Sequence, residues 1–420
     1  MKSIKAFVAM VLLLISLSGC TLGPDFVKPD MTPPSSYRTD IMPAVSADDL
    51  KWWELFDDPV LFDLVTVALD NNKDVKIDVS RMDEARASLG FTRADQFPRL
   101  DLQGGANRGT FSGGVRSEDT NYYAYIAPVL SWEIDFWGRF RRGIQSADAG
   151  LAASIANYDN ALVLLISQVA QTYAAIRTAE EQLRVARENV VLQERSLDIT
   201  RIRFRYGDAD ELDVQQARTL LLSTQATIPQ FEITLDQARN ALSTLLARPP
   251  GDLADLLGSA GEIPSLPEEI ATGVPADLLR RRPDVRQVEL QARAQSALIG
   301  VAEADLYPSF TLAGSIGLSA ADGTDTTRTG DSGPGELFRS DSLVFQGGPA
   351  FSWNILNYGR IKNNVRIQDA RFQQLLISYQ DTVLAAAQEV EDSMVAYVRG
   401  LKQERILAES VEAAKRSVDL

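Results

Sequence analysis

The chain has 420 residues, 45% of them hydrophobic, which is ample for a sizeable core. It contains no histidine and one cysteine, so Ser-His-Asp and Cys-His catalytic sites and histidine-ligated metal sites are excluded. No pair of carboxylates stands in a context that suggests catalysis, and we expect neither an enzyme nor a bound cofactor or metal. The net charge of −15 argues against a nucleic-acid partner, because phosphate backbones are bound by clustered Lys and Arg.

Residues 1–19 have the features of a lipoprotein signal peptide. Lys2 and Lys5 form a basic start, and residues 6–17 form an apolar core that is too short to span a bilayer as a helix. The core runs into the sequence LSGC, which resembles the lipobox of bacterial lipoproteins. We therefore expect cleavage before Cys20 and attachment of acyl chains to this residue. An ordinary secretory leader with a chance cysteine is the alternative.

An internal repeat organises the rest of the chain. The sequence ADQFPRLDLQGG from Ala94 matches ADLYPSFTLAGS from Ala304, an offset of 210 residues. The sequence PVLSWEIDFWGRFRRGIQSADA from Pro128 matches PAFSWNILNYGRIKNNVRIQDA from Pro349, an offset of 221 residues. Two copies of one unit therefore make up most of the chain. Each copy predicts a helix, a strand, a loop, a strand and a long helix, so the fold class is mixed α and β.

Each copy contains two segments that alternate with the period of two expected of a β-strand. In the second copy, Phe310 and Leu312 alternate with Ser309 and Thr311; the second strand of the first copy is less regular, with tyrosines on both faces. Strands of about ten residues with one apolar and one polar face suit a transmembrane barrel, although a half-buried sheet in a soluble protein shares the pattern. The four predicted strands span about 99–108, 121–132, 309–319 and 342–353.

Four strands cannot close a barrel, and open sheet edges are not tolerated in lipid. Either the sheet is soluble, or several protomers contribute strands to one barrel. Three copies would give twelve strands, which is wide enough for an aqueous lumen. The segments rich in Gly, Ser, Thr and Asp that join the paired strands are expected to be extracellular loops.

The long helices predict a coiled coil. Apolar residues recur every seven positions in the first copy, and the pattern returns from Leu376 to Val418 with Glu404 as its single break. A strict seven-residue repeat imposes a left-handed supercoil. No proline interrupts residues 143–203, which would extend about 90 Å as a helix. The positions in the first copy are Ile155, Leu162, Val169, Ile176, Leu183, Val190 and Leu197.

The chain resembles a known family, the TolC-like outer-membrane efflux proteins, and within it the lipoprotein branch that is OprM- or NodT-like. Five blocks in the family's order carry this resemblance, and they extend from near the lipobox into the second copy. They are WWELFDDPVLFDLVTVAL from Trp52, SWEIDFWGRFRR from Ser131, RFRYGDADELDVQQAR from Arg203, LLARPPG from Leu245 and VPADLLRRRPDVRQVE from Val274.

The resemblance implies a homotrimer in the cell outer membrane, lipid-anchored and spanning it, with a twelve-stranded β-barrel and an α-helical periplasmic tunnel of antiparallel coiled helices. Such a duct is passive and exports small molecules or drugs. A periplasmic adaptor, or membrane fusion protein, would join it to an inner-membrane transporter, expected to be of the resistance-nodulation-division type. Its partners are thus copies of itself, these two proteins and membrane lipid.

Together with this resemblance, the patterns divide the chain into five segments. The first is the signal peptide, the second an N-terminal anchor and collar segment, and the fourth a Pro-rich equatorial connector between the two repeats. The second copy ends early, since the offset of 221 places the counterpart of Ile199 at Leu420, and we expect a longer protein of about 470 residues once the counterpart of residues 200–247 is added. The segments are 1–19, 20–59, 60–248, 249–282 and 283–420.

Residues 204–213 resemble a tunnel tip, the place where adaptors dock in this family. Gly207 is expected to end the long helix and Asp210 to begin the return helix as its N-cap. Acids at a helix N-terminus are favoured by the helix dipole, so capping and solvation are the alternative explanation for them. The predicted docking residues are Tyr206, Gly207, Asp208, Asp210, Glu211 and Asp213.

Two further groups of residues have competing explanations. The cluster Arg280, Arg281, Arg282 and Arg286 is expected to be solvated or paired with carboxylates rather than to bind a ligand. Tryptophans near the strand ends either belong to an aromatic belt at the membrane surface or serve ordinary packing. They are Trp132, Trp137 and Trp353.

Other functions remain open at this level. The outer component of a type I protein secretion system would share the fold and differ in its partner. A surface lipoprotein with a long coiled coil would form no pore and no heat-resistant trimer. A carboxylate-based periplasmic hydrolase would need paired acids in a cleft, whereas the acids here are dispersed along helix faces.

Overall fold

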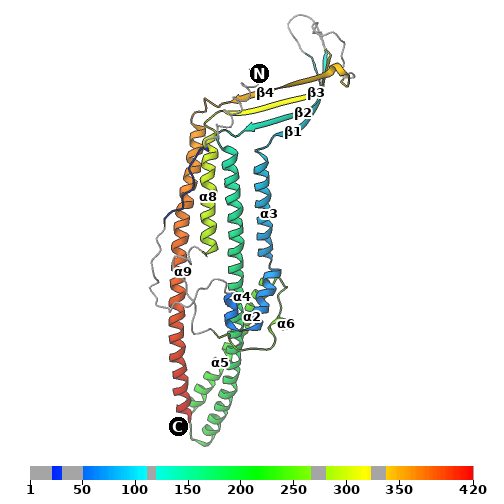
Figure 1. Cartoon of the computed structure of the whole chain (residues 1–420). Coiled ribbons are helices and arrows are strands. Elements are labelled where there is room, and N and C mark those ends of the chain that lie inside the picture. The colour runs from blue at the N-terminus through cyan, green and yellow to red at the C-terminus, as the bar shows by residue number, and fades with distance from the viewer. Residues whose placement is uncertain (1–20, 31–50, 111–119, 266–280, 323–336, 420) are drawn as a thin grey trace. The chain divides into compact units, whose positions relative to one another are not determined.

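The computed structural model describes residues 21–30, 51–110, 120–265, 281–322 and 337–419 (Figure 1). They fall into two compact units. Unit 1 comprises Met1–Asp30, Asp83–Ala153 and Gln287–Asp381, and unit 2 comprises Met31–Met82, Ser154–Arg286 and Thr382–Leu420. The helices and strands in chain order are η1 (Trp52–Phe56), α2 (Pro59–Asn71), α3 (Lys73–Ala94), β1 (Arg99–Thr110), β2 (Thr120–Ile134), α4 (Arg139–Tyr206), α5 (Glu211–Leu245), α6 (Ala254–Leu257), α8 (Pro283–Ala304), β3 (Ser309–Asp322), η3 (Ser340–Ser342), β4 (Leu343–Ser352) and α9 (Arg360–Asp419).

Unit 1 contains a four-stranded antiparallel sheet in the order β1-β2-β3-β4. The predicted mixed α and β class, with four antiparallel strands and long helices, is confirmed. The strands extend past several expected ends, because β1 reaches Thr110, β2 covers Thr120–Ile134 and β3 reaches Asp322. The loops expected between paired strands fall largely on residues 111–119 and 323–336, which lie outside the described residues.

All four helical connections of the sheet lie at one of its ends. Arg99 at the start of β1 pairs with Ser131 of β2, and Phe310 at the start of β3 pairs with Ile134 at the end of β2. Helices α3 and α8 therefore enter the sheet where β2 and β4 leave it for α4 and α9 (Figure 1). The other end of the sheet carries only strand-to-strand connections.

Indole hydrogen bonds fix the turns between helices and strands. Trp132 Nε1 donates to the carbonyl oxygen of Gln96 at 2.9 Å, and Trp353 Nε1 donates to that of Leu306 at 3.0 Å. The two donors are 221 residues apart and the two acceptors 210, the offsets of the two repeated blocks. Trp137 Nε1 donates to the carbonyl of Pro308 at 2.8 Å. Each tryptophan thus satisfies a carbonyl that no strand or helix ladder uses.

The core of unit 2 forms around the middle of α4. Val169 and Ile176, two of the predicted seven-residue positions, are fully buried there. They pack with Leu64 of α2 and Leu242 of α5, and α6 adds Leu257. The residues at these seven-residue positions thus form the face of α4 that the neighbouring helices cover.

Candidate functional site

One face of the sheet is apolar along all four strands. The register pairs Leu102 with Pro128, Trp132 with Leu312 and Ile316 with Phe345. Because side chains alternate along each strand, paired residues share a face. This apolar face comprises Leu100, Leu102, Ala106, Ala124, Ile126, Leu130, Trp132, Ile134, Phe310, Leu312, Ile316, Leu318, Leu343, Phe345 and Phe351.

The apolar face is open within the chain. Phe345 is 80% exposed, Phe351 is 72% exposed and Leu102 is 71% exposed. Contiguous apolar surface of this extent is unusual on a soluble monomer and marks a site that another molecule or a membrane covers. The face therefore requires an apolar covering that this chain does not provide among its described residues.

The opposite face of the sheet carries mostly polar and small side chains, with Val129 and Val344 among them. Gln103, Thr311, Ser315 and Gln346 lie on it, together with glycines and alanines. Tyr123 and Tyr125, which made the second strand look irregular, have the same parity as these residues, and their rings stack at 5.5 Å. The register therefore places Tyr123 and Tyr125 on the same face of the sheet as the polar residues.

Strands β1 and β4 are the edges of the sheet. In the part of the chain that the structure describes, each pairs with one neighbour only. An edge strand presents a row of backbone N–H and C=O groups that can pair with another chain. The sheet thus has an apolar face, a polar face and two edges able to accept further strands.

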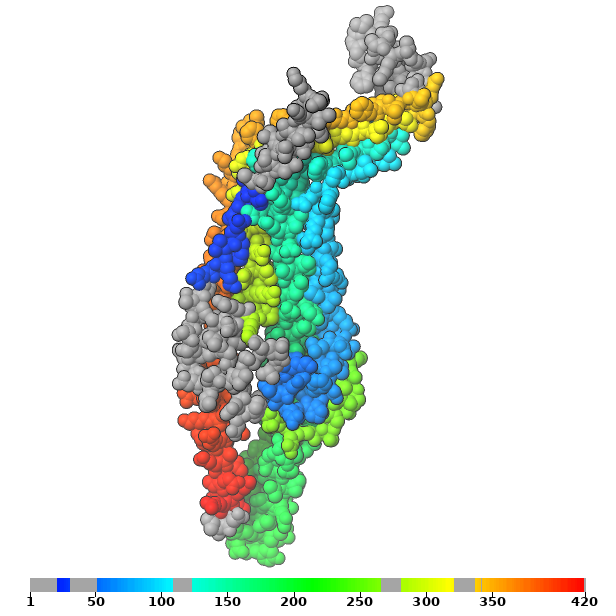
Figure 2. Space-filling view, viewed as in Figure 1, coloured from blue at the N-terminus to red at the C-terminus, as the bar shows by residue number. Residues whose placement is uncertain are grey.

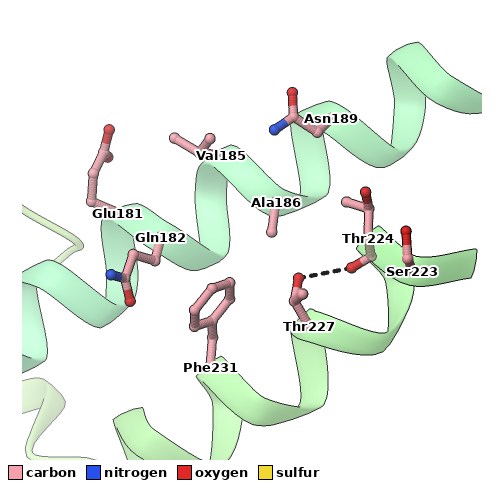
Figure 3. Close-up of a pocket in the computed structure, with 9 residues that line it drawn as sticks. All are labelled: Glu181, Gln182, Val185, Ala186, Asn189, Ser223, Thr224, Thr227 and Phe231. Carbon is pink, nitrogen blue, oxygen red and sulfur yellow. Dashed lines mark hydrogen bonds between the residues drawn. The ribbon is translucent and has the colours of Figure 1, made fainter. Parts of the chain in front are cut away.

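Helices α4 and α5 form a hairpin with an open groove between them in unit 2. The groove measures about 500 Å³. Val185 and Ala186 face it from α4, and Phe231 faces it from α5, with Thr224 and Thr227 beside it (Figure 3). The Thr227 hydroxyl donates from Oγ1 to the Thr224 carbonyl. Thr227 lies two residues before Pro229, which has no amide hydrogen to donate within α5. The remaining lining residues are Glu181, Gln182, Asn189 and Ser223.

The turn of this hairpin has the geometry expected of the predicted tip. Gly207 has a φ of +82°, a left-handed conformation that glycine adopts without strain. The amide of Asp208 donates to the Arg203 carbonyl at 2.9 Å, which closes the end of α4. Asp210 and Asp213 form a reciprocal capping box at the start of α5, with bonds of 3.0 and 3.1 Å.

The tip residues divide into two groups. Asp210 and Asp213 are explained by capping alone. Tyr206 is 79% exposed, and Asp208 and Glu211 are also exposed and lie outside the capping box. Among the described contacts, Tyr206 and Asp208 have no side-chain partner that explains them, whereas Glu211, in the first turn of α5, is also favoured by the helix dipole.

A buried polar network joins the collar segment to α4 within unit 2. Tyr173 donates its hydroxyl hydrogen to Asp58 at 2.7 Å, and Asp58 also caps α2. Arg177 is 2% exposed and donates to the Tyr173 oxygen, to Glu180 at 2.9 Å and to the Leu257 carbonyl at 2.8 Å. Burial raises the pKa of the Tyr173 hydroxyl, and the bond to Asp58 adds to this against the opposing effect of Arg177.

Sequence reasoning missed this network. The signal was available, because Arg177 directly follows the core position Ile176 and lies four residues after Tyr173. A charged residue beside a core position on a long helix needs a carboxylate and carbonyl partners. Here Glu180 on the same helix supplies the carboxylate, and the distant residues Leu257 and Ser259 supply the carbonyls.

The family follows from a comparison with known proteins. The model described as "Outer membrane efflux protein" matches residues 64–248 and 274–420, far more than half of the chain. The chain belongs to the outer membrane efflux protein family. The predicted family and the predicted location in the outer membrane are thereby confirmed, and this family is a class of channels rather than of enzymes.

Individual relatives resemble this efflux protein along most of its length. Nodulation protein T of Rhizobium leguminosarum bv. viciae is 31% identical over 415 residues, covering 98% of this chain and 83% of the relative. The probable outer membrane lipoprotein SilC of Salmonella typhimurium is 30% identical over 384 residues, covering 90% and 80%. The solved outer-membrane channel OprN has a TM-score of 0.84 at 30% identity and covers 94% of this chain and 87% of that one.

The remaining predicted site residues have different outcomes. Cys20, the expected lipid-attachment residue of the efflux protein, lies outside the described residues. Of the basic cluster, Arg282 pairs with Asp284 at 2.8 Å and with Glu389 at 2.6 Å, as the carboxylate-paired explanation expected. Burial opposes ionisation of Asp284, but the hydrogen bonds from Arg282 and the Val285 amide and the charge of Arg282 together outweigh it and lower the pKa of this carboxyl.

Proposed function

We propose that this protein is the outer-membrane duct of a tripartite efflux system, a passive homotrimer that carries small molecules or drugs out of the cell. The observation that carries the proposal is the sheet, whose register gathers apolar side chains on one face, polar ones on the other, and leaves both edges open. In a bilayer only a closed barrel satisfies the edge strands.

Three copies of the sheet would close the barrel. Each supplies four strands, so a trimer has twelve, and β4 of one protomer would pair with β1 of the next. The apolar face would meet lipid and the polar face would line an aqueous lumen. The recurrence of the bonds from Trp132 and Trp353 at the offsets of the sequence repeat supports duplication of a single two-stranded unit.

The long helices would continue the lumen as a periplasmic tunnel. Helix α4 has 68 residues, which corresponds to about 100 Å at 1.5 Å per residue. Such a length exceeds what a bilayer requires, and it would let the duct reach toward an inner-membrane partner.

The tip would be the docking point for a periplasmic adaptor. Tyr206, Asp208 and Glu211 are the exposed tip residues that capping does not explain. The inner-membrane transporter, of the resistance-nodulation-division type, would supply the energy, since the family is one of channels. Acyl chains on Cys20 would anchor the chain to the outer membrane, in addition to the anchoring that the barrel provides.

Electrical recording from purified protein tests the channel. We expect a detergent-resistant trimer that opens long-lived conducting pores in planar lipid bilayers. A monomer without conductance would refute the duct and favour a non-channel surface lipoprotein.

A variant of the tip tests the adaptor separately. Replacing Asp208 and Glu211 with Asn and Gln removes two charges and leaves the capping pair intact. We expect wild-type conductance together with higher drug accumulation in cells, because the pore would form but would no longer couple to the pump. Unchanged accumulation would remove the tip from adaptor docking.

A further inference from the structure

The chain directly after Cys20 packs against other residues of unit 1. We call Thr21–Asp30 the strap, which Figure 2 shows in dark blue on the surface of the molecule. The Leu22 amide donates to the Trp137 carbonyl at 3.1 Å. Farther along, the ring of Phe26 meets that of Phe372 edge to face at 6.4 Å, and Lys28 pairs with Glu289.

Arg142 holds the start of the strap through its backbone. Its side chain is nearly buried, with 5% of the residue exposed. Nε donates to the Leu22 carbonyl and Nη2 to the Gly23 carbonyl, both at 2.9 Å. Nη1 donates to Gln145 at 2.9 Å and pairs with Asp25 at 2.8 Å. A buried guanidinium needs such partners, and the strap supplies three of the four.

Two glycines make room for the strap. A Cβ at Gly300, near the C-terminal end of α8, would lie 2.4 Å from the Leu22 carbonyl oxygen. A Cβ at Gly138, whose φ is +78°, would lie 2.7 Å from the Thr21 side chain. Glycine within a helix costs about 0.5–1 kcal/mol relative to alanine, so a close approach is the structural reason for Gly300.

The repeat provides an internal comparison. The counterparts of Gly300, Gly138 and Arg142 at the two offsets are Gly90, Gly359 and Asn363. A Cβ at Gly90 would meet nothing within 4 Å, and one at Gly359 would meet only Asn363 at 3.8 Å. The duplicated scaffold therefore has glycines at both places, whereas the arginine occurs only where the strap lies.

We propose that Gly138, Arg142 and Gly300 form a strap clamp that positions the lipid anchor of this protein. Thr21, the residue that follows Cys20 in the sequence, lies against Gly138, between the end of β2 and the start of α4. The clamp thereby fixes the acyl chains at the end of the sheet where the helices leave. This inference rests on the lipid attachment at Cys20 that is part of the proposed function.

Hydrogen exchange tests the clamp itself. In the purified full-length protein, Gly300→Ala should make the Leu22 amide, which donates to Trp137, exchange at least about tenfold faster, while the rest of α8 stays protected. Arg142→Gln should act in the same direction. The matched control, Gly90→Ala, should leave exchange in the strap unchanged. Wild-type protection of the strap in Gly300→Ala and Arg142→Gln would overturn the clamp.

Assembly in cells tests the positioning of the anchor. We expect Arg142→Gln to slow the formation of heat-resistant oligomers several-fold in the lipidated protein. It should add nothing in a Cys20→Ala protein exported with an ordinary cleavable leader, because no anchor then needs positioning. Equal slowing in both backgrounds would show a merely structural role and overturn the proposal.

Mass spectrometry of the N-terminal peptide separates the two claims. Acylated Cys20 with unaltered assembly of Arg142→Gln would remove the positioning role and leave the proposed duct and its anchor intact. An unmodified Cys20 would remove the anchor from the proposed function and, with it, the positioning role, whereas bilayer conductance would still decide the duct.

Discussion

The sheet of unit 1 and the helical core of unit 2 differ in how far their apolar side chains are exposed. Leu64, Val169 and Leu242 of the core are fully buried, whereas Leu102 and Phe345 of the sheet are more than 70% exposed. Unit 2 also buries a charged side chain, Arg177, which is surrounded by hydrogen-bond partners. The core is thus complete within one chain, and the sheet is complete only when something apolar covers it.

The largest expected effect concerns the open apolar face. Phe345→Arg places a charge on the face that we assign to lipid, where arginine costs about 2–4 kcal/mol near the bilayer midplane. We expect the loss of heat-resistant trimers from outer-membrane fractions, measured by semi-native electrophoresis. The neighbouring Gln346→Arg lies on the opposite face and should assemble normally; equal tolerance of both variants would contradict the assignment of the faces.

The next effect concerns the buried network. Arg177→Met removes the donor to the Leu257 carbonyl and leaves Glu180 with Arg239 as its cationic partner. Removal of one partner of a buried pair costs about 3–5 kcal/mol. We expect a clear drop in the thermal unfolding temperature of the solubilised protein, followed by circular dichroism. Arg184→Met is the control, because Arg184 pairs with Glu181 on the exposed surface, where such pairs contribute about 0–1 kcal/mol. Similar losses in the two variants would show that burial is not the cause.

A smaller effect is expected at the tip of the hairpin. Gly207→Ala forces a side chain into a left-handed conformation at a φ of +82°, at a cost of about 1–2 kcal/mol. The control Gly150→Ala lies in open space on α4 and should be neutral or slightly stabilising. Local hydrogen exchange in residues 204–213 should rise in the first variant only, and a rise in both would place the strain elsewhere.

The smallest effect is a dependence on pH. The folded pKa of Asp284 lies below its ordinary value of 3.8, so the folded state favours the ionised carboxyl. Its contribution to stability is complete above pH 3.8 and is lost as the pH falls through the folded pKa. Arg282→Gln should therefore be less stable than the wild type near pH 7, and the difference in the free energy of unfolding should shrink as the pH falls below 3.8. Identical acid profiles would show that the pair does not contribute.

The sequence by itself determined the elements of this protein. The alternation around Phe310 and Leu312 and the sevens along α4 are local patterns, and local patterns decide which residues become strands and helices. The composition of the turn around Gly207 and Asp210 likewise predicted the end of one helix and the start of the next, because caps depend on residues within a few positions of each other.

Only the tertiary structure decided which distant groups meet. The strand register gathered the apolar residues of four separate strands on one face and showed that Tyr123 and Tyr125 belong to the other. The backbone carbonyls that accept from Arg142 and Arg177 lie far away along the chain, at Leu22 and Gly23 for the first and at Leu257 for the second. No spacing rule links such residues, since their contacts depend on how helices pack, and packing is settled by the shape and polarity of whole surfaces rather than by the order of residues in one segment.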